Sequence, residues 1–301
     1  MRVAAVMLLA LVAACGEEPP QAARLSDADR LVLGRAVAAK QAGRDREVAE
    51  ILAELLARTP PPPEAQLVAG EAAYDLGRYA EAAERLTDAV ARLPSYLPSA
   101  SHLGFAHYKL GQFPQAATVF RSIVAVRPEA YKAHYGLGHV ALAEGRTAEA
   151  RASLEEALRL QPDYLKAHFD LGRVLQEEGR LEEAAGEYES VLARWPSHGE
   201  ALFRLAQVRA AQGRQADADA VLARRAEVYA LNEELGGLVQ QVRAGTDAAE
   251  TWQRIVLLQD RLGEDEEAAR ALRDGLQRFP ADPGLAELQR AGLGTAEPDQ
   301  R

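Results

Sequence analysis

Aromatic and basic side chains recur at fixed positions along this 301-residue chain, and they are its best candidates for a binding function. Eight of them fall in columns that repeat every 34 residues: Tyr108, Lys132, Tyr135, His139, Lys166, Phe169, Arg173 and Phe203. Rings beside a few cations suit an extended peptide that carries carboxylate groups, because rings supply contact area and cations pair with carboxylates. The alternative is that the aromatic residues only support packing between repeats.

The patterns of known catalytic sites are missing from the sequence. It has no G-x-S-x-G, H-E-x-x-H, P-loop or dinucleotide-binding pattern. His134 and His168 occupy the same position of adjacent repeats. Adjacent helices lie about 8–10 Å apart, whereas ligand atoms lie about 2 Å from a shared metal ion. We therefore expect these histidines to replace a bulky core residue, and we expect no metal, no cofactor and no enzymatic activity.

The elements that would position the eight residues follow the same interval. Glycine returns every 34 residues at Gly43, Gly77, Gly111, Gly145, Gly179 and Gly213, and proline does so at Pro60, Pro94, Pro128, Pro162 and Pro196. Self-similarity at a period of roughly 20–50 residues indicates one supersecondary unit stacked on copies of itself. Between these markers the apolar residues have helical spacing, in two segments of about 13 residues that would each be about 20 Å long.

Each unit is therefore predicted to be a pair of antiparallel helices. In the unit at 97–130, Pro98 and Pro114 suit the first turns of the two helices. Gly111 suits the left-handed residue that ends the first helix. Gly104 has no side chain, so we expect the partner helix to pack against the backbone there. Neither helix can bury its apolar face alone, which explains why several copies occur together.

This pattern resembles the tetratricopeptide repeat (TPR) family, whose motif places a bulky residue three before Leu-Gly, then Ala, a bulky residue four further on, and Pro. Two successive copies read His134, Leu137, Gly138, Ala150, Leu154, Pro162 and His168, Leu171, Gly172, Ala184, Tyr188, Pro196. The resemblance implies an all-α, right-handed superhelical solenoid of antiparallel helix pairs, with about seven repeats over residues 29–282. It also implies that the first helix of each unit lines the concave side, where the eight residues would lie.

The expected units are 29–62, 63–96, 97–130, 131–164, 165–198, 199–248 and 249–282, followed by a capping helix and tail at 283–301. The sixth unit is longer than the others. Val228, Leu231, Leu235, Leu238 and Val242 are spaced 3, 4, 3 and 4 residues apart, which is a heptad seam on one long helix predicted at 216–244. The seam would pack either against the final repeat or against a second copy of the chain. A homo-oligomeric structural protein that assembles through 228–242 is therefore an alternative function.

The N-terminus is typical of an exported protein. Arg2 precedes an apolar run from Val3 to Val12. A membrane span needs roughly 20 residues, so this run is read as part of a signal peptide. The run leads into Ala13-Ala14-Cys15, which holds the single cysteine of the chain. This segment is similar to a bacterial lipoprotein signal at 1–14, and the resemblance implies cleavage before Cys15 and lipidation of it, with 15–28 as lipidated residue and tether. The alternative is an ordinary secretory signal that ends near a cysteine.

The net charge and the residue after the cysteine indicate which class of partner is excluded and which membrane is favoured. Asp and Glu number 45 against 35 Lys and Arg, a net charge of −10, so the chain gains nothing from phosphate counterion release and nucleic acid is excluded as a partner. Gly16 rather than Asp follows the cysteine, which in such lipoproteins favours the outer membrane, here facing the periplasm. We predict a non-enzymatic, lipid-anchored envelope scaffold that binds a peptide or protein in its concave groove during envelope-complex, pilus or secretion assembly. An accessory subunit of an envelope enzyme is a further alternative.

Overall fold

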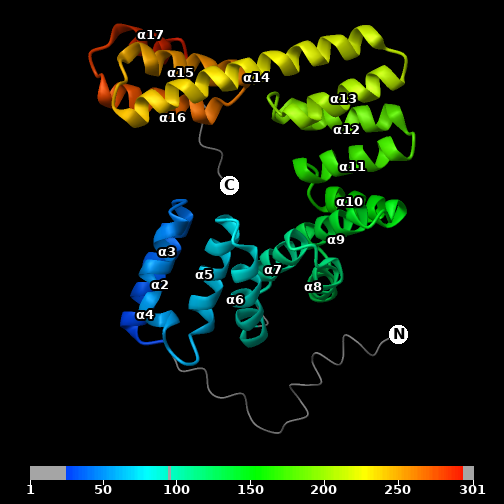
Figure 1. The fold of residues 1–301 in the computed structure, drawn as a ribbon, viewed down its shortest axis with the longest axis vertical. Coiled ribbons are helices and arrows are strands. Elements are labelled where there is room, and N and C mark those ends of the chain that lie inside the picture. The colour runs from blue at the N-terminus through cyan, green and yellow to red at the C-terminus, as the bar shows by residue number, and fades with distance from the viewer. Residues whose placement is uncertain (1–24, 94–95, 294–301) are drawn as a thin grey trace. The chain divides into compact units, whose positions relative to one another are not determined.

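The chain folds into α-helices that follow one another in antiparallel pairs (Figure 1). The computed structural model describes residues 25–93 and 96–293, apart from the side chains of 97–99, and in these ranges it contains sixteen α-helices and no strand. The expected lipoprotein signal and Cys15 lie outside the described residues. The helices form two compact units, with the boundary between Asp163 and Tyr164. The prediction of an all-α solenoid of helix pairs is confirmed.

Unit 1 contains four helix pairs. Their bounds are α2 Asp27–Gln41, α3 Asp45–Ile51, α4 Ala53–Leu56, α5 Pro63–Asp75, α6 Tyr79–Arg92, α7 Leu97–Lys109, α8 Phe113–Val126, α9 Tyr131–Ala143 and α10 Thr147–Leu160. In the first pair the second helix is in two pieces, α3 and α4, which Leu52 separates. Consecutive helices pack against each other, and the first helices α5, α7 and α9 also touch their neighbours, so the core continues from one pair to the next.

Unit 2 contains three helix pairs and a terminal helix. Their bounds are α11 Leu165–Glu177, α12 Leu181–Arg194, α13 Gly199–Ala211, α14 Gln215–Ala244, α15 Ala249–Leu262, α16 Asp265–Arg278 and α17 Pro283–Arg290. Helix α14 is 30 residues long and continues through Gly236 and Gly237. None of the helices in the described ranges of the chain is both long and apolar enough to cross a membrane.

In four of the helix pairs, a glycine on the first helix meets a large residue on the second helix. A Cβ built on Gly104 of α7 would lie 2.6 Å from the ring of Phe120, and one on Gly172 of α11 would lie 2.8 Å from the ring of Tyr188. Phe120 and Tyr188 are fully buried. The helices of these pairs therefore approach closely because the first helix has no side chain at the contact, as the sequence predicts.

The turn between the helices of a pair ends on a left-handed glycine. Gly111 has a φ of +73° and Gly145 a φ of +71°. Nothing lies within 4 Å of a Cβ built on either residue, so glycine is needed there for its backbone conformation and not for space.

The heptad seam of α14 packs inside unit 2. Val228 and Leu231 are buried together with Leu258 and Leu262 of α15. The later seam residues, at 235, 238 and 242, pack against the core that α15, α16 and α17 share. The seam thus makes the contact with the final repeat that was one of its two predicted roles.

Candidate functional site

Three of the eight predicted site residues meet in unit 1, on the contacting helices α7 and α9. The ring centroids of Tyr108 and His139 lie 4.2 Å apart, and those of Tyr135 and His139 lie 5.3 Å apart with 26° between the planes. Phe105 extends the group, 5.9 Å from Tyr135. Tyr135 is only 7% exposed and contributes mainly to packing, whereas Tyr108 and His139 are half-buried. We call Phe105, Tyr108, Tyr135 and His139 the unit 1 aromatic cluster.

Lys132, the fourth predicted residue of unit 1, is exposed near the start of α9. Its ammonium group lies 5.9 Å from the ring centroid of Tyr131. The structure does not show it in contact with the unit 1 aromatic cluster, so its expected place beside those rings stays a prediction.

The four predicted residues of unit 2 lie on α11 and α13, and each has its own surroundings. Phe169 is half-buried, with its ring centroid 5.8 Å from that of Tyr188 and 5.3 Å from that of His198. Phe203, also half-buried, packs against the guanidinium group of Arg225, 5.0 Å from the ring centroid. Lys166 is exposed at the start of α11.

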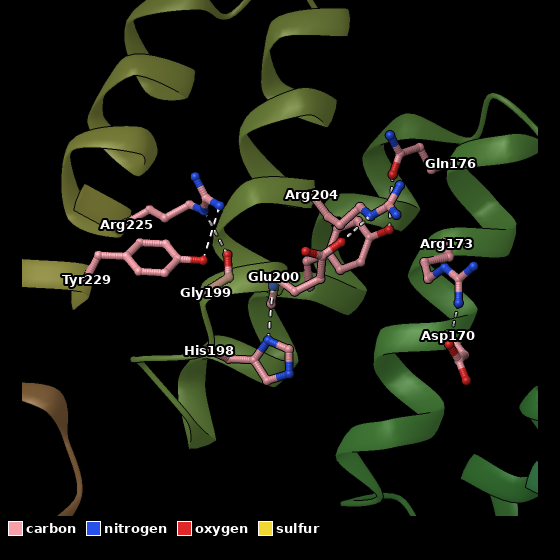
Figure 2. Close-up of polar contacts among 11 residues, drawn as sticks. Asp170, Arg173, Gln176, His198, Gly199, Glu200, Arg204, Arg225 and Tyr229 are labelled. Atoms are coloured by element: carbon pink, nitrogen blue, oxygen red, sulfur yellow. Dashed lines mark hydrogen bonds and ion pairs between the residues drawn. The ribbon is translucent and has the colours of Figure 1, made fainter. Parts of the chain in front are cut away.

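Arg173 is held by a buried carboxylate on its own helix. Its Nη1 donates to Oδ1 of Asp170 at 3.1 Å, and the Asp170 side chain is only 4% exposed. Figure 2 shows the two side chains side by side on α11. Because Arg173 is already paired with a buried carboxylate, it has a role in the fold in addition to any role in ligand binding. The 34-residue spacing does not reveal this pairing.

Residues outside the predicted columns complete the surface of unit 2. Arg204 Nε donates to Glu200 Oε1 at 3.0 Å on α13, and Arg225 and Tyr229 reach the start of α13 from α14 (Figure 2). Arg225 and Tyr229 lie on α14, the second helix of its pair, whereas the predicted columns take residues from the first helices, so the columns miss them. Their i, i+4 spacing on one helix is the signal that would find them.

The hydroxyl of Tyr188 makes a polar contact beneath this surface. It donates to Oε1 of Gln176 at 3.1 Å, and burial raises the pKa of Tyr188 well above its usual range. The phenol therefore stays protonated and acts as a donor that orients the Gln176 side chain on α11.

His198 acts as the N-cap of α13. Its Nδ1 accepts a hydrogen bond from the backbone N–H of Ala201 at 3.0 Å, so this nitrogen carries no proton. The ring also lies 4.7 Å from that of Trp195, edge to face. Burial lowers the pKa of His198, which is consistent with a neutral capping imidazole.

The expectation that His134 and His168 replace core residues needs correction. Both are half-buried and hydrogen-bonded: His134 Nε2 lies 2.7 Å from the carbonyl oxygen of Pro128, and His168 Nδ1 lies 2.6 Å from Glu187 Oε2. The polar rings reach partners near the surface, which a closed core would deny them. Within residues 25–93 and 96–293 no group of three or more His, Cys, Asp or Glu side chains is placed to hold a metal ion.

Fold and surface together define an all-α repeat protein of the kind that acts as a protein–protein interaction scaffold. The tetratricopeptide repeat model matches residues 33–96, 103–165 and 169–228, which is more than half of the chain. The chain belongs to the tetratricopeptide repeat family, as the motif residues predict. Proteins of this family are generally non-enzymatic interaction scaffolds.

Solved structures of other repeat proteins resemble parts of the chain. A MamA RS-1 double mutant is 22% identical with a TM-score of 0.50, and the match covers 56% of this chain and 95% of that one. TTC0263, a thermophilic TPR protein in Thermus thermophilus, is 27% identical with a TM-score of 0.49, over 60% of this chain and 97% of its own. The likeness to MamA concerns the fold alone. No curated protein sequence matches the chain.

Proposed function

We propose that this protein is a non-enzymatic, lipid-anchored scaffold of the cell envelope that binds a peptide or protein partner along its first helices. The observation that supports the proposal is the partial exposure of four aromatic rings on those helices. Tyr108 and His139 in unit 1, and Phe169 and Phe203 in unit 2, are half-buried, so each offers part of its surface to a partner. Aromatic side chains that are fixed by their neighbours are the usual anchors of protein interfaces.

The sequence of the N-terminus supports the envelope part of the proposal. The apolar run from Val3 to Val12 and the lone Cys15 have the order of a lipoprotein signal. Several acyl chains, at about 0.8 kcal/mol per buried CH₂, anchor a protein stably where a single chain is marginal. Gly16 favours the outer membrane, facing the periplasm, where such a scaffold would serve the assembly of an envelope complex, a pilus or a secretion system.

Partner binding is tested with the full chain in cells. Cross-linked complexes are captured from membranes for wild type, for the double variant Tyr108→Ala/Phe169→Ala, and for Val126→Ala. Val126 is an apolar residue on the second helix α8 that is 72% exposed, so it controls for the loss of exposed apolar area. The proposal expects proteins that wild type and Val126→Ala retain and the double variant loses. The same captured proteins in all three would contradict it.

Anchoring is tested separately with Cys15→Ser. We expect this variant to be released from membranes by mild washing and to leave the detergent phase in phase separation, while wild type stays in it. A variant that still enters the detergent phase would show that the anchor does not depend on Cys15.

A further inference from the structure

Arg225 differs from the other half-buried arginines of the described chain. Nine of these pair with an Asp or Glu side chain: Arg85, Arg92, Arg146, Arg151, Arg173, Arg180, Arg204, Arg209 and Arg224. Within residues 25–93 and 96–293, Arg225 is the half-buried arginine that has no carboxylate partner. A guanidinium that is partly removed from water without a counter-charge is costly, so its surroundings indicate what it is for.

Neutral groups and two aromatic rings hold Arg225 in place, and Figure 2 shows its contacts with Gly199 and Tyr229. Its Nε donates to the carbonyl oxygen of Gly199 at 3.2 Å, and its Nη2 donates to the hydroxyl of Tyr229 at 3.3 Å. The guanidinium carbon lies 5.0 Å from the ring centroid of Phe203 and 4.8 Å from that of Tyr229. These contacts leave Nη1 without a hydrogen bond to any residue in the described part of the chain. Rings and hydrogen bonds thus fix the plane of a guanidinium that keeps donors available.

The carboxylates closest to this position in the sequence are engaged elsewhere. Glu200, next to Gly199 on α13, accepts from Arg204. Glu227, on the same helix as Arg225, accepts from Arg224 and from Arg261 at 2.9 and 2.7 Å. The counter-charge for Arg225 therefore does not come from these neighbours.

The two rings beside Arg225 offer apolar contact at the same place. Tyr229 is 56% exposed, and Phe203 is half-buried. A fixed guanidinium pairs well with a carboxylate because its N–H groups match the two oxygens. A side chain that follows the carboxylate in a peptide would find the rings within reach. In a chain with a net charge of −10, an acidic ligand needs such a local cation to overcome the general repulsion.

We propose that Arg225, Phe203 and Tyr229 form a docking site for an acidic segment of a partner protein. An Asp or Glu side chain of the partner pairs with Arg225, and a neighbouring apolar side chain of the partner packs on Phe203 and Tyr229. This inference rests on the proposed function as a peptide-binding scaffold and names the chemistry of the ligand. It places the anchoring cation on α14, outside the eight residues that the repeat interval selects.

The probe is a displayed library of random peptides that are joined to the carrier through their C-termini, selected against the full chain. We expect the selected sequences to be enriched in Asp or Glu next to an aromatic or aliphatic residue. One selected peptide is then synthesised with a label and an amidated C-terminus, and its affinity is measured by fluorescence anisotropy. Changing its acidic residue to the matching amide should weaken binding to wild type about tenfold, as the loss of one charge-assisted hydrogen-bonded pair does.

Variants of the protein show whether Arg225 binds the carboxylate of the peptide. Arg225→Gln should lose about as much affinity as the amide peptide does, and the amide peptide should bind Arg225→Gln no worse than the acidic one, because the two changes remove the same pair. Arg224→Gln is the matched control, since Arg224 is the adjacent arginine and is paired with Glu227. It should bind like wild type. Should Arg225→Gln fail to fold, the comparison of acidic and amide peptides on wild type still tests the ligand chemistry.

Several outcomes would overturn the inference. Equal affinity of wild type for the acidic and amide peptides would show that no carboxylate is read. An unchanged preference for the acidic peptide in Arg225→Gln would place the cation elsewhere. Selected peptides without acidic residues would overturn the inference but leave the scaffold function standing, whereas a library that yields no binders would count against both.

Discussion

Leu154 on α10 lies directly against the backbone of Gly138 on α9. A Cβ built on Gly138 would come within 2.7 Å of Leu154 Cγ and within 3.2 Å of the backbone oxygen of Ala150. Leu154 is fully buried. The Leu154 side chain can shift by a few tenths of an ångström, but the backbone of α10 cannot shift without moving the whole helix, so a side chain and the backbone of α10 together limit the space at Gly138.

We expect Gly138→Leu to destabilise unit 1. The added side chain has no room between α9 and α10, and overpacking of this kind costs typically about 1–3 kcal/mol. Because each repeat is stabilised by its neighbours, the loss should spread to the adjoining pairs. Thermal unfolding followed by circular dichroism measures the effect. Gly34→Leu is the control, because Gly34 lies on α2 with nothing within 4 Å of a Cβ. Equal melting temperatures for the two variants would mean that the pair contact is misplaced.

The helix pairs could be predicted from the sequence because the contact that defines them has a fixed spacing. Gly104 precedes Phe120 by the same 16 residues that separate Gly138 from Leu154, and each glycine faces its large partner in the structure. Both residues of the contact lie within one 34-residue repeat, so the sequence of a single repeat is enough to predict the contact. The left-handed glycine of the turn repeats in the same way.

Much of the candidate site could not be predicted, because no single column of positions 34 residues apart contains both partners of its contacts. Arg225 meets Phe203 and the carbonyl of Gly199 because a side chain of the second helix α14 reaches the first helix α13, and columns taken along the first helices do not contain this contact. Asp170 is another case, since the sequence places a carboxylate on α11 but does not show that it is buried and holds Arg173. Columns of residue types locate a surface, whereas burial and pairing decide what each side chain does there.

Replacing Gly236 and Gly237 by alanine should stabilise unit 2. Both glycines lie inside α14, are exposed, and have nothing within 4 Å of a Cβ. Glycine in a helix interior costs about 0.8–1 kcal/mol relative to alanine, so each substitution should raise the urea midpoint by a corresponding amount. Gly245→Ala is the contrasting variant, because Gly245 ends α14 with a φ of +70°. It should lower the midpoint. A lower midpoint in the Gly236→Ala/Gly237→Ala protein would show that the long helix needs its glycines.

The Arg173→Ala variant should lose more free energy of unfolding than the double variant Asp170→Asn/Arg173→Ala. Arg173→Ala takes a charged hydrogen-bond donor away from a carboxylate that is 4% exposed, and we expect a loss on the order of 1–3 kcal/mol. In Asp170→Asn/Arg173→Ala the buried side chain is neutral, so part of the loss should be recovered. Urea unfolding of the two single variants and the double variant gives the coupling energy. Strictly additive losses would mean that the pair makes no contribution of its own.

The last prediction concerns pH and the cap of α13. His198 accepts the N–H of Ala201 through Nδ1, which only the unprotonated nitrogen can do. Burial lowers the pKa of His198 in the folded protein, and the nearby Glu200 opposes this shift. A pKa that is lower in the folded state means that the unfolded chain takes up the proton more readily. The stabilisation is therefore complete above about pH 6.5, the ordinary value for histidine, and is lost as the pH falls from there through the lowered pKa of the folded state.

We expect His198→Asn to reduce this pH dependence, because asparagine caps a helix without titrating in this range. The measurement is the urea midpoint at a series of pH values from neutral to mildly acidic, for wild type and variant. Burial also lowers the pKa of His102 in unit 1, but that group is present in both proteins, so the difference between their pH profiles isolates His198. Loss of ring contact with Phe169 and Trp195 would lower the variant's stability at every pH and leave its slope unaffected. Parallel profiles for the two proteins would show that protonation of His198 does not release the cap.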